Sequence, residues 1–203
     1  MKIVCIGRNY VEHALELKNE VPAEPVFFMK PDTALLQPGR PFYLPSFSSD
    51  IHYEAELVIR ICKEGKNIQE AFAPRYYDRV TVGIDFTARD VQQRQKEKGL
   101  PWEPAKAFDG SAAVGEFLPW KEAADQGDLQ FSLSLNGELR QDGSSSLMIF
   151  SFDRIISYIS NYVTLRKGDL VFTGTPKGVG AVKKGDEITC RMKEKVVLNL
   201  KIA

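Results

Sequence analysis

The clearest strand pattern in the chain lies in the stretch His52-Tyr53-Glu54-Ala55-Glu56-Leu57-Val58-Ile59-Arg60-Ile61. Residues 56–61 have the period of two that predicts a β-strand. Side chains two positions apart on a strand point to one face, roughly 6–7 Å from each other, so Glu54 and Glu56 are expected to lie together. In a partly buried site, two such carboxylates repel, and the pKa of one rises unless a cation lies between them. The alternative interpretation is the solvated face of an edge strand.

Strand patterns outnumber helix patterns in the rest of the chain. Residues 129–135 alternate and are followed by Asn136-Gly137, a dipeptide typical of a hairpin turn. Because strands and helices do not alternate regularly, a doubly wound parallel sheet is not expected. We predict a mixed α/β, β-rich fold dominated by a rolled or barrel-like sheet. The further predicted strands are residues 80–84, 169–173, 187–192 and 196–202.

Helices are expected to be few and short. Residues 9–17 fit a short helix, and residues 67–72 fit a helical turn. Residues 87–98 are predicted to form a polar helix, in which Thr87 and Asp90 resemble an acidic capping box. A later helix is expected to begin after Ser151 and to carry an apolar stripe from residue 152 to residue 163. Residues 22–45 are rich in proline, which predicts an extended surface path.

Composition excludes several classes of protein. The 203 residues carry 27 basic and 27 acidic side chains, so the net charge is zero and a nucleic-acid partner is not expected. The longest uncharged stretch, residues 155–165, is far shorter than the ~20 apolar residues that span a bilayer. Three scattered cysteines, Cys5, Cys62 and Cys190, indicate reduced thiols in a cytoplasmic protein and do not favour a zinc site.

A third carboxylate adds to the pair on the first strand. Asp85 ends the predicted strand at residues 80–84. Three oxygen ligands suit a hard dication such as Mg²⁺ or Mn²⁺ rather than zinc. They also leave coordination positions for water and for a substrate that chelates the ion.

Other side chains suit catalysis or substrate binding. His13 and Glu16 lie three positions apart on a predicted helix, where a carboxylate can orient a histidine that acts as a base. Lys106 lies in an apolar setting and could stabilise an oxyanion. Taken alone, both groups also fit ordinary surface positions. The glycine-rich loop at residues 174–180 could hold a carboxylate or form a tight turn.

Ordered motifs covering nearly the whole chain resemble the fumarylacetoacetate hydrolase family, in particular its short acylpyruvase and oxaloacetate decarboxylase-like members. The motifs are Cys5-Ile6-Gly7-Arg8-Asn9-Tyr10 with His13, His52-Tyr53-Glu54-Ala55-Glu56-Leu57, Gly83-Ile84-Asp85-Phe86-Thr87-Ala88-Arg89-Asp90, Gly99-Leu100-Pro101-Trp102, Lys106-Ala107-Phe108-Asp109, Asn136-Gly137, Gln141-Asp142-Gly143, Met148-Ile149-Phe150 and Thr173-Gly174-Thr175-Pro176.

The resemblance implies a β-roll with a few short helices and an N-terminal lid helix, formed by one catalytic domain over residues 1–203, and a homodimer. It implies that Mg²⁺ or Mn²⁺ is the cofactor and that a 2-oxo acid is the substrate. By the same resemblance, the metal ligands are Glu54, Glu56 and Asp85, the catalytic residues are His13, Glu16 and Lys106, and the substrate contacts are Arg8, Arg89, Gln92 and Thr175.

The activity expected from this resemblance is hydrolysis of a C–C bond in 2,4-diketo acids, which converts an acylpyruvate into pyruvate and a carboxylic acid. Oxaloacetate decarboxylation and keto–enol isomerisation, including that of a 2-hydroxy-diene dioate, are the alternatives, because all of these reactions pass through an enolate. A non-catalytic β domain with a structural cation site is the alternative from another class.

Overall fold

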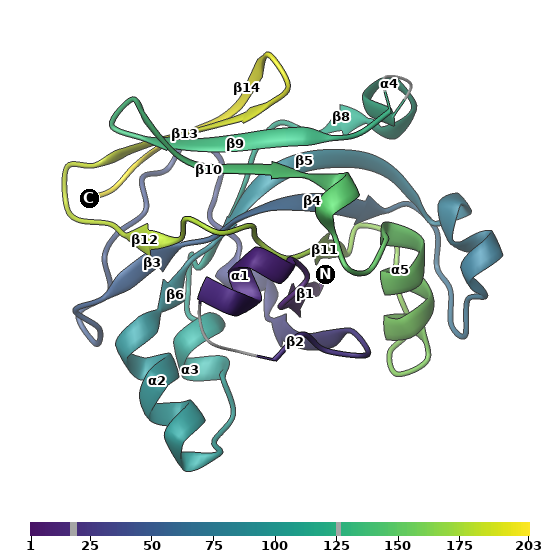
Figure 1. Ribbon diagram of the computed structural model, residues 1–203, viewed down its shortest axis with the longest axis horizontal. Helices are drawn as coiled ribbons and strands as arrows, with labels where there is room; N and C mark the ends of the chain where they lie inside the picture. Colours follow the sequence, from purple (N-terminus) through teal and green to yellow (C-terminus); the bar gives the residue numbers. More distant parts are fainter. Residues whose placement is uncertain (17–19, 125–126) are drawn as a thin grey trace.

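The computed structural model describes residues 1–16, 20–124 and 127–203 as a curled, β-rich structure with short helices around it (Figure 1). The largest sheet has 7 strands, in the order β2-β1-β11-β4-β5-β7, with β8 paired to β5. β1 and β11 run parallel and the other pairs in this sheet run antiparallel, so the sheet is not doubly wound. Its strands are β1 (Ile3–Gly7), β2 (Val26–Lys30), β4 (Ala55–Ile61), β5 (Tyr77–Asp85), β7 (Ala112–Val114), β8 (Leu118–Pro119) and β11 (Leu170–Phe172).

Two smaller sheets flank the large one. The 4-stranded sheet has the order β10-β9-β13-β14, and the 3-stranded sheet has the order β12-β3-β6. The predicted hairpin is confirmed: Asn136 and Gly137 join β9 to β10 with φ values of 53° and 82°, as a type I′ turn requires. The strands are β3 (Ile51–Tyr53), β6 (Thr87–Ala88), β9 (Gln130–Leu135), β10 (Glu138–Ser144), β12 (Gly180–Ala181), β13 (Glu187–Met192) and β14 (Lys195–Lys201).

The helices are short and pack around the sheets. Ser151 is the predicted N-cap of α5, since its hydroxyl accepts a hydrogen bond of 3.2 Å from the Arg154 N–H. α5 ends at Ser160, before the predicted end of the apolar stripe. The helices are α1 (Val11–Glu16), α2 (Arg89–Lys98), α3 (Glu103–Lys106), α4 (Trp120–Ala124) and α5 (Phe152–Ser160), with 3₁₀ turns η1 (Asp32–Ala34), η2 (Glu70–Arg75) and η3 (Ser145–Leu147).

Two helix predictions near the N-terminus need correction. α1 begins at Val11 rather than at residue 9, because Tyr10 is held by a β-bridge to Met148. The predicted end at residue 17 lies outside the described residues. The helical turn expected at residues 67–72 lies instead at residues 70–75.

The proline-rich segment is only partly the surface path that was predicted. β2 forms within it as an edge strand, paired to β1 on one side, and Pro25 and Pro31 lie just outside its ends. A proline is tolerated at such positions because it removes no ladder hydrogen bond. Lys30 and Phe42 of this segment are both 1% exposed, so the segment also reaches the interior.

The predicted capping box at the start of the polar helix is wrong. α2 begins at Arg89, and Thr87 instead pairs with His52 in the short ladder between β3 and β6. The Thr87 hydroxyl accepts a hydrogen bond from Lys106, and the Asp90 carboxylate accepts from Ser48 and from the Val91 N–H. The predicted end is confirmed, because Gly99 caps α2 with a φ of 62°.

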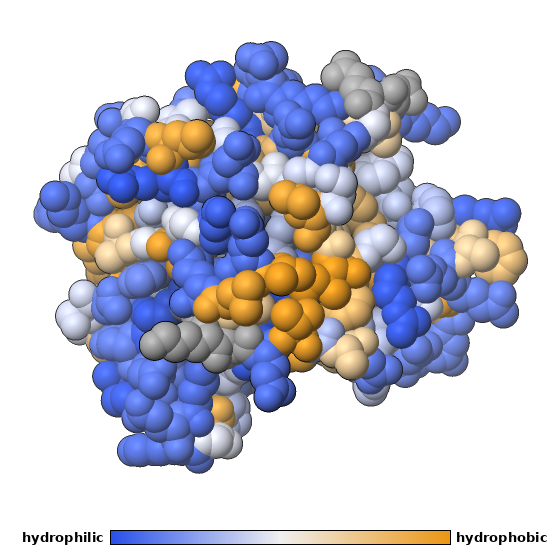
Figure 2. Space-filling view, in the orientation of Figure 1, coloured by the Kyte–Doolittle hydropathy of each residue, from blue (hydrophilic) through white to orange (hydrophobic). Residues whose placement is uncertain are grey.

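Apolar side chains from the sheets and from α5 form the core that fixes the site-bearing strands. Leu57 of β4, Val82 of β5 and Ile156 of α5 have no exposed surface and belong to one cluster. In Figure 2, apolar atoms gather on the surface over α1 and β2, where Leu15 and Val26 are exposed. Within residues 1–16, 20–124 and 127–203, no helix is long and apolar enough to cross a membrane.

Candidate active site

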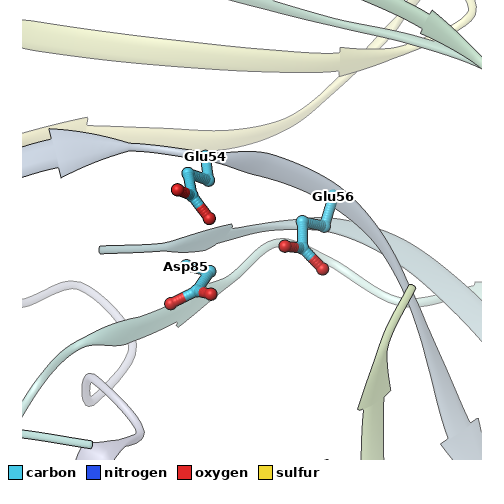
Figure 3. Close-up of side chains that lie close together, drawn as sticks. All are labelled: Glu54, Glu56 and Asp85. Carbon is cyan, nitrogen blue, oxygen red and sulfur yellow. The ribbon is translucent and has the colours of Figure 1, made fainter. Parts of the chain in front are cut away.

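Three buried carboxylates lie together where β4 and β5 meet (Figure 3). Glu54 lies in the one-residue break between β3 and β4, not within a strand as predicted; Glu56 lies on β4 and Asp85 ends β5. One oxygen from each lies within 4.8 Å of the others. At an effective dielectric constant of about 20, two unit charges at this separation repel by about 3 kcal/mol. The cluster therefore needs positive charge beside it.

Protein cations provide part of that charge. Lys106, on α3, donates hydrogen bonds of 2.7 Å to Glu54 Oε2 and to Asp85 Oδ2, and a third to the Thr87 hydroxyl. These bonds use all three donors of the ammonium group. Arg89 Nη2 donates to Glu54 Oε1 over 2.5 Å. The predicted direct contact of Lys106 with an oxyanion therefore requires one of these bonds to be exchanged.

Lys30 is a buried cation that the sequence analysis missed. Its Nζ lies 2.8 Å from Asp85 Oδ1 without the alignment of a hydrogen bond. It also donates to the Ser111 hydroxyl over 2.9 Å and to the Lys106 carbonyl. One sequence signal could have found it: a lysine that directly follows the apolar run Val26-Phe27-Phe28-Met29 is expected to bury at least part of its side chain.

The cations lie nearer to Glu54 than to Glu56, and the pKa values of these two carboxyl groups shift in opposite directions. Burial raises the pKa of Glu54, but Lys106 and Arg89 outweigh it and hold that pKa below its usual value. For Glu56, burial and the charges of Asp85 and Glu54 raise the pKa well above its usual value. The one hydrogen bond described for the Glu56 side chain comes from the Gly174 N–H, over 2.7 Å. Glu56 therefore lies on the side of the cluster that lacks positive charge.

The glycine-rich loop at residues 174–180 binds two carboxylates of the protein itself. Its Gly174 N–H contacts Glu56, and its Gly178 N–H donates to Glu16 over 3.1 Å. Buried amide side chains hold the loop in place. Asn9 donates to the Thr173 carbonyl over 2.7 Å, and Gln141 donates to the Thr175 hydroxyl over 2.8 Å.

The predicted dyad on α1 is formed. His13 is 6% exposed, and its Nδ1 lies 3.2 Å from Glu16 Oε2. Burial lowers the pKa of His13 below 6.5, despite the opposing effects of Glu54 and Glu16. The imidazole is therefore neutral near pH 7 and can accept a proton.

One pocket brings the predicted residues together. Every predicted site residue except Glu16 lines it, and Glu16 contacts it through His13. Arg89 and Gln92 are joined by a hydrogen bond of 2.7 Å, and Arg89 Nε is buried without a hydrogen-bond partner in the described part of the chain. The pocket is lined by Ile6, Gly7, Arg8, His13, Phe28, Glu54, Glu56, Asp85, Arg89, Gln92, Lys96, Trp102, Lys106 and Thr175.

The carboxylate cluster fits a divalent cation. Its donors are all oxygen atoms and lie close enough to share one ion. Among the described residues, the hydrogen-bond partner of Glu56 is a backbone N–H and not a cation, and Asp85 Oδ1 has the Lys30 ammonium 2.8 Å away but no aligned hydrogen bond. Glu56 therefore offers the cluster an oxygen that a divalent cation would satisfy.

The chain is similar over nearly its whole length to known proteins. A family model described as "Fumarylacetoacetate (FAA) hydrolase C-terminal" matches residues 2–203. The mitochondrial oxaloacetate tautomerase of Rattus norvegicus is 46% identical over 200 residues, which cover 98% of this chain and 90% of that protein. A mitochondrial oxaloacetate decarboxylase of Dictyostelium discoideum is 44% identical over 190 residues, covering 93% and 87%. The crystal structure of fumarylpyruvate hydrolase from Pseudomonas aeruginosa with Mn²⁺ and pyruvate has a TM-score of 0.93 at 38% identity, covering 100% of this chain and 89% of that one.

Proposed function

This chain belongs to the fumarylacetoacetate hydrolase family, and from that premise we propose that it is a divalent-metal-dependent enzyme that acts on oxaloacetate. The reaction we propose first is keto–enol tautomerisation, and decarboxylation is its closest alternative. Both pass through an enolate that forms from the 2-keto group. The relatives are an oxaloacetate tautomerase and an oxaloacetate decarboxylase. They therefore favour these two reactions, which the sequence analysis named as alternatives, over acylpyruvate hydrolysis.

The charge of the pocket is the observation that carries this proposal. Three carboxylates line it, and so do four cations: Arg8, Arg89, Lys96 and Lys106. Lys30 adds a further positive charge behind Asp85. Positive charges therefore outnumber the carboxylates, and a bound dication would increase this excess of positive charge. Such a site favours a dianion such as oxaloacetate over an acylpyruvate with a neutral acyl group, which carries one negative charge.

A dication held by Glu54, Glu56 and Asp85 would supply a Lewis acid at the carboxylate and keto oxygens of a 2-oxo acid. Mg²⁺ and Mn²⁺ both suit this all-oxygen donor set. The protein's own groups do the rest. The Nε of Arg89, which has no hydrogen-bond partner among the described residues, donates to a substrate oxygen, and Thr175 lines the same pocket. Lys106 contributes a positive field where negative charge develops.

His13 is the base in this proposal. In the keto-to-enol direction, neutral His13 takes a proton from C3, the electron pair forms the C2–C3 double bond, and the C2–O electrons move to the keto oxygen, which takes the proton back from His13; the enol-to-keto direction is the reverse. Glu16 keeps the imidazole in position through Nδ1. In decarboxylation, the C3–C4 bond breaks instead, CO₂ leaves and its bond electrons form the same type of enolate.

One assay pair separates the two reactions. Ultraviolet absorbance follows the conversion of enol to keto oxaloacetate, and a coupled dehydrogenase assay measures pyruvate. The proposal expects Mg²⁺-dependent acceleration of the absorbance change that EDTA abolishes. Pyruvate formation at an equal rate would assign the protein as a decarboxylase. Acceleration of neither reaction would contradict the proposal.

Acylpyruvate-type hydrolysis is a second candidate, because the His13–Glu16 pair can also activate water for attack on a distal carbonyl. The structural relative that hydrolyses fumarylpyruvate supports keeping it. A Mg²⁺-dependent assay over acetylpyruvate, longer acylpyruvates and fumarylpyruvate tests it. The homodimer and the cytoplasmic location stay predictions of the sequence analysis.

A further inference from the structure

One face of α2 presents three polar side chains to the pocket. Arg89, Gln92 and Lys96 all line it, at positions i, i+3 and i+7. This spacing places residues on the same side of a helix. Side chains on a helix lean toward its N-terminus, so Lys96 extends back over the preceding turn, which carries Gln92. The face therefore extends the polar wall of the pocket beyond the carboxylate cluster.

Two cations that line the pocket, Lys96 and Arg8, differ from the others. Lys106 and Arg89 are bound to carboxylates of the cluster. Within residues 1–16, 20–124 and 127–203, Lys96 and Arg8 have no hydrogen bond or ion pair with an acidic side chain. Both are only partly exposed. Burial and the nearby charges of Arg89 and Arg8 lower the pKa of Lys96, and the charge of Glu54 opposes them only in part.

The surroundings of both residues show that their placement is specific. The ammonium of Lys96 lies 5.7 Å from the centre of the Trp102 ring, which in turn packs against Phe28 at 5.9 Å. Arg8 has a φ of 60°, a left-handed conformation that costs a non-glycine residue of order 1 kcal/mol. The backbone therefore holds Arg8 at the pocket at a conformational cost, and the Trp102 ring, which Phe28 supports, limits where Lys96 can lie.

We propose that Lys96 and Arg8 form a second anion subsite, which binds the carboxylate of a 2-oxo diacid that is remote from its keto group. This inference rests on the proposed function, because it assigns the second negative charge of the substrate. The first carboxylate and the keto oxygen lie at the Glu54–Glu56–Asp85 cluster. Lys96 is thereby the residue that selects diacids over 2-oxo acids with a neutral tail.

The test compares Lys96→Met with Lys98→Met in the Mg²⁺-loaded protein. Methionine keeps an unbranched side chain over Trp102 and has a similar helix propensity, so α2 is retained. Lys98 is exposed on the same helix and does not line the pocket, which makes it the matched control. The substrates are oxaloacetate and its 4-methyl ester, which differ in the distal charge.

For Lys96→Met, kcat/KM for oxaloacetate is expected to fall by about 10–100-fold, the usual worth of a charge-assisted hydrogen bond. The value for the methyl ester is expected to change less than about threefold, and Lys98→Met is expected to leave both unchanged. An equal loss for the two substrates, or no loss for either, would overturn the subsite.

Binding measurements keep the subsite separate from the proposed reaction. Calorimetry with 3,3-difluoro-oxaloacetate and 3,3-difluoro-2-oxobutyrate uses ligands that have no proton at C3 and therefore cannot enolise. The wild type is expected to bind the diacid more tightly, and Lys96→Met is expected to remove that preference. If oxaloacetate is not turned over but the preference is present, the proposed function fails and the subsite stands. If both proteins bind the two ligands alike, the subsite fails.

Discussion

Glu56 is the carboxylate whose environment depends most on a bound cation. Its side chain accepts a hydrogen bond from the Gly174 N–H. Burial raises the pKa of Glu56 most, and the charges of Asp85 and Glu54 raise it further. In Glu56→Gln, the amide oxygen keeps the contact with Gly174 and the repulsion disappears. We expect the variant to melt at a higher temperature than the wild type in EDTA, and Mg²⁺ to raise its melting temperature less.

Turnover of oxaloacetate by Glu56→Gln is expected to fall by at least about 100-fold, since a ligand of the cation is lost. Thermal scans with EDTA and with Mg²⁺, together with the enol assay, check both effects. A variant that is less stable than the wild type in EDTA and keeps full activity would show that Glu56 has a purely structural role.

His13 sets the expected dependence of activity on pH. Its pKa is lowered in the folded protein, chiefly by burial, so the neutral form persists below pH 6.5. We therefore expect kcat/KM to hold as the pH falls to 6.5 and to decline only at lower pH, as His13 gains a proton. A pH–rate profile measures the midpoint.

His52 is the matched control for that profile, because it is the other histidine of the chain and does not line the pocket. His13→Gln is expected to lower kcat by about 10²–10⁴-fold and to remove the decline of kcat/KM at low pH (the acid limb of the profile). His52→Gln is expected to keep that decline. An acid limb that disappears in His52→Gln and remains in His13→Gln would reverse the assignment.

For individual residues, the sequence located the acidic cluster and the His13–Glu16 dyad because ordered motifs carry them. It missed Lys30 because the contacts of that side chain are remote in sequence: Ser111 is 81 positions away. It treated Lys106 as free to bind an oxyanion, whereas Glu54, Asp85 and Thr87 take its donors. Pairings of this kind depend on how β2, β5 and α3 pack, which local pattern does not specify.

Among the elements, the pairing of β4 with β5 positions the cluster. Gly83 pairs with Glu56 in this ladder, and a Cβ added at Gly83 would lie 2.7 Å from Val58 Cγ2 and 2.8 Å from the Ala113 carbonyl oxygen. The contact with backbone cannot be relieved by a rotamer change. Gly83→Ala is therefore expected to lower the free energy of unfolding by about 1–3 kcal/mol.

Gly7→Ala is the control for this prediction, because the nearest atoms to a Cβ at Gly7 are 3.9 Å away. Urea unfolding of both variants measures the difference. If Gly83→Ala unfolds like Gly7→Ala, the close packing between β4 and β5 does not constrain the site.

The elements that sequence predicted best have strong local signals. The turn at Asn136 and Gly137, the Ser151 cap and the end of α2 at Gly99 are each specified by neighbouring residues. The start of α2 was predicted wrongly because Thr87 is used by tertiary contacts, the ladder with His52 and the hydrogen bond from Lys106. β2 was missed since prolines surround it and only its pairing with β1 makes it a strand.

For the whole molecule, we predict one domain that unfolds cooperatively and associates as a homodimer. Calorimetry of dilute protein is expected to show a single unfolding transition. Its calorimetric enthalpy, taken per unit that unfolds as one, is expected to equal the van't Hoff enthalpy. Sedimentation is expected to give twice the chain mass of 22.8 kDa. Two separate transitions, or a monomer at all concentrations tested, would contradict the respective prediction.

The curled β-rich architecture was predictable because its strands carry alternating patterns and its helices do not alternate with them. The order β2-β1-β11-β4-β5-β7 was not, because β1 and β11 pair across most of the chain length, Ile3 with Leu170. That pairing brings the loop at Gly174 next to Glu56. The site is thus assembled from both ends of the chain.

Calorimetric titration of Mn²⁺ into metal-free protein tests the central claim most directly, with the wild type compared with Glu54→Gln, Glu56→Gln and Asp85→Asn. The claim predicts one ion per chain for the wild type, and binding weakened by at least about tenfold in each variant. Equal affinity in the wild type and all three variants would mean that the ion binds elsewhere, and the proposed chemistry would lose its site.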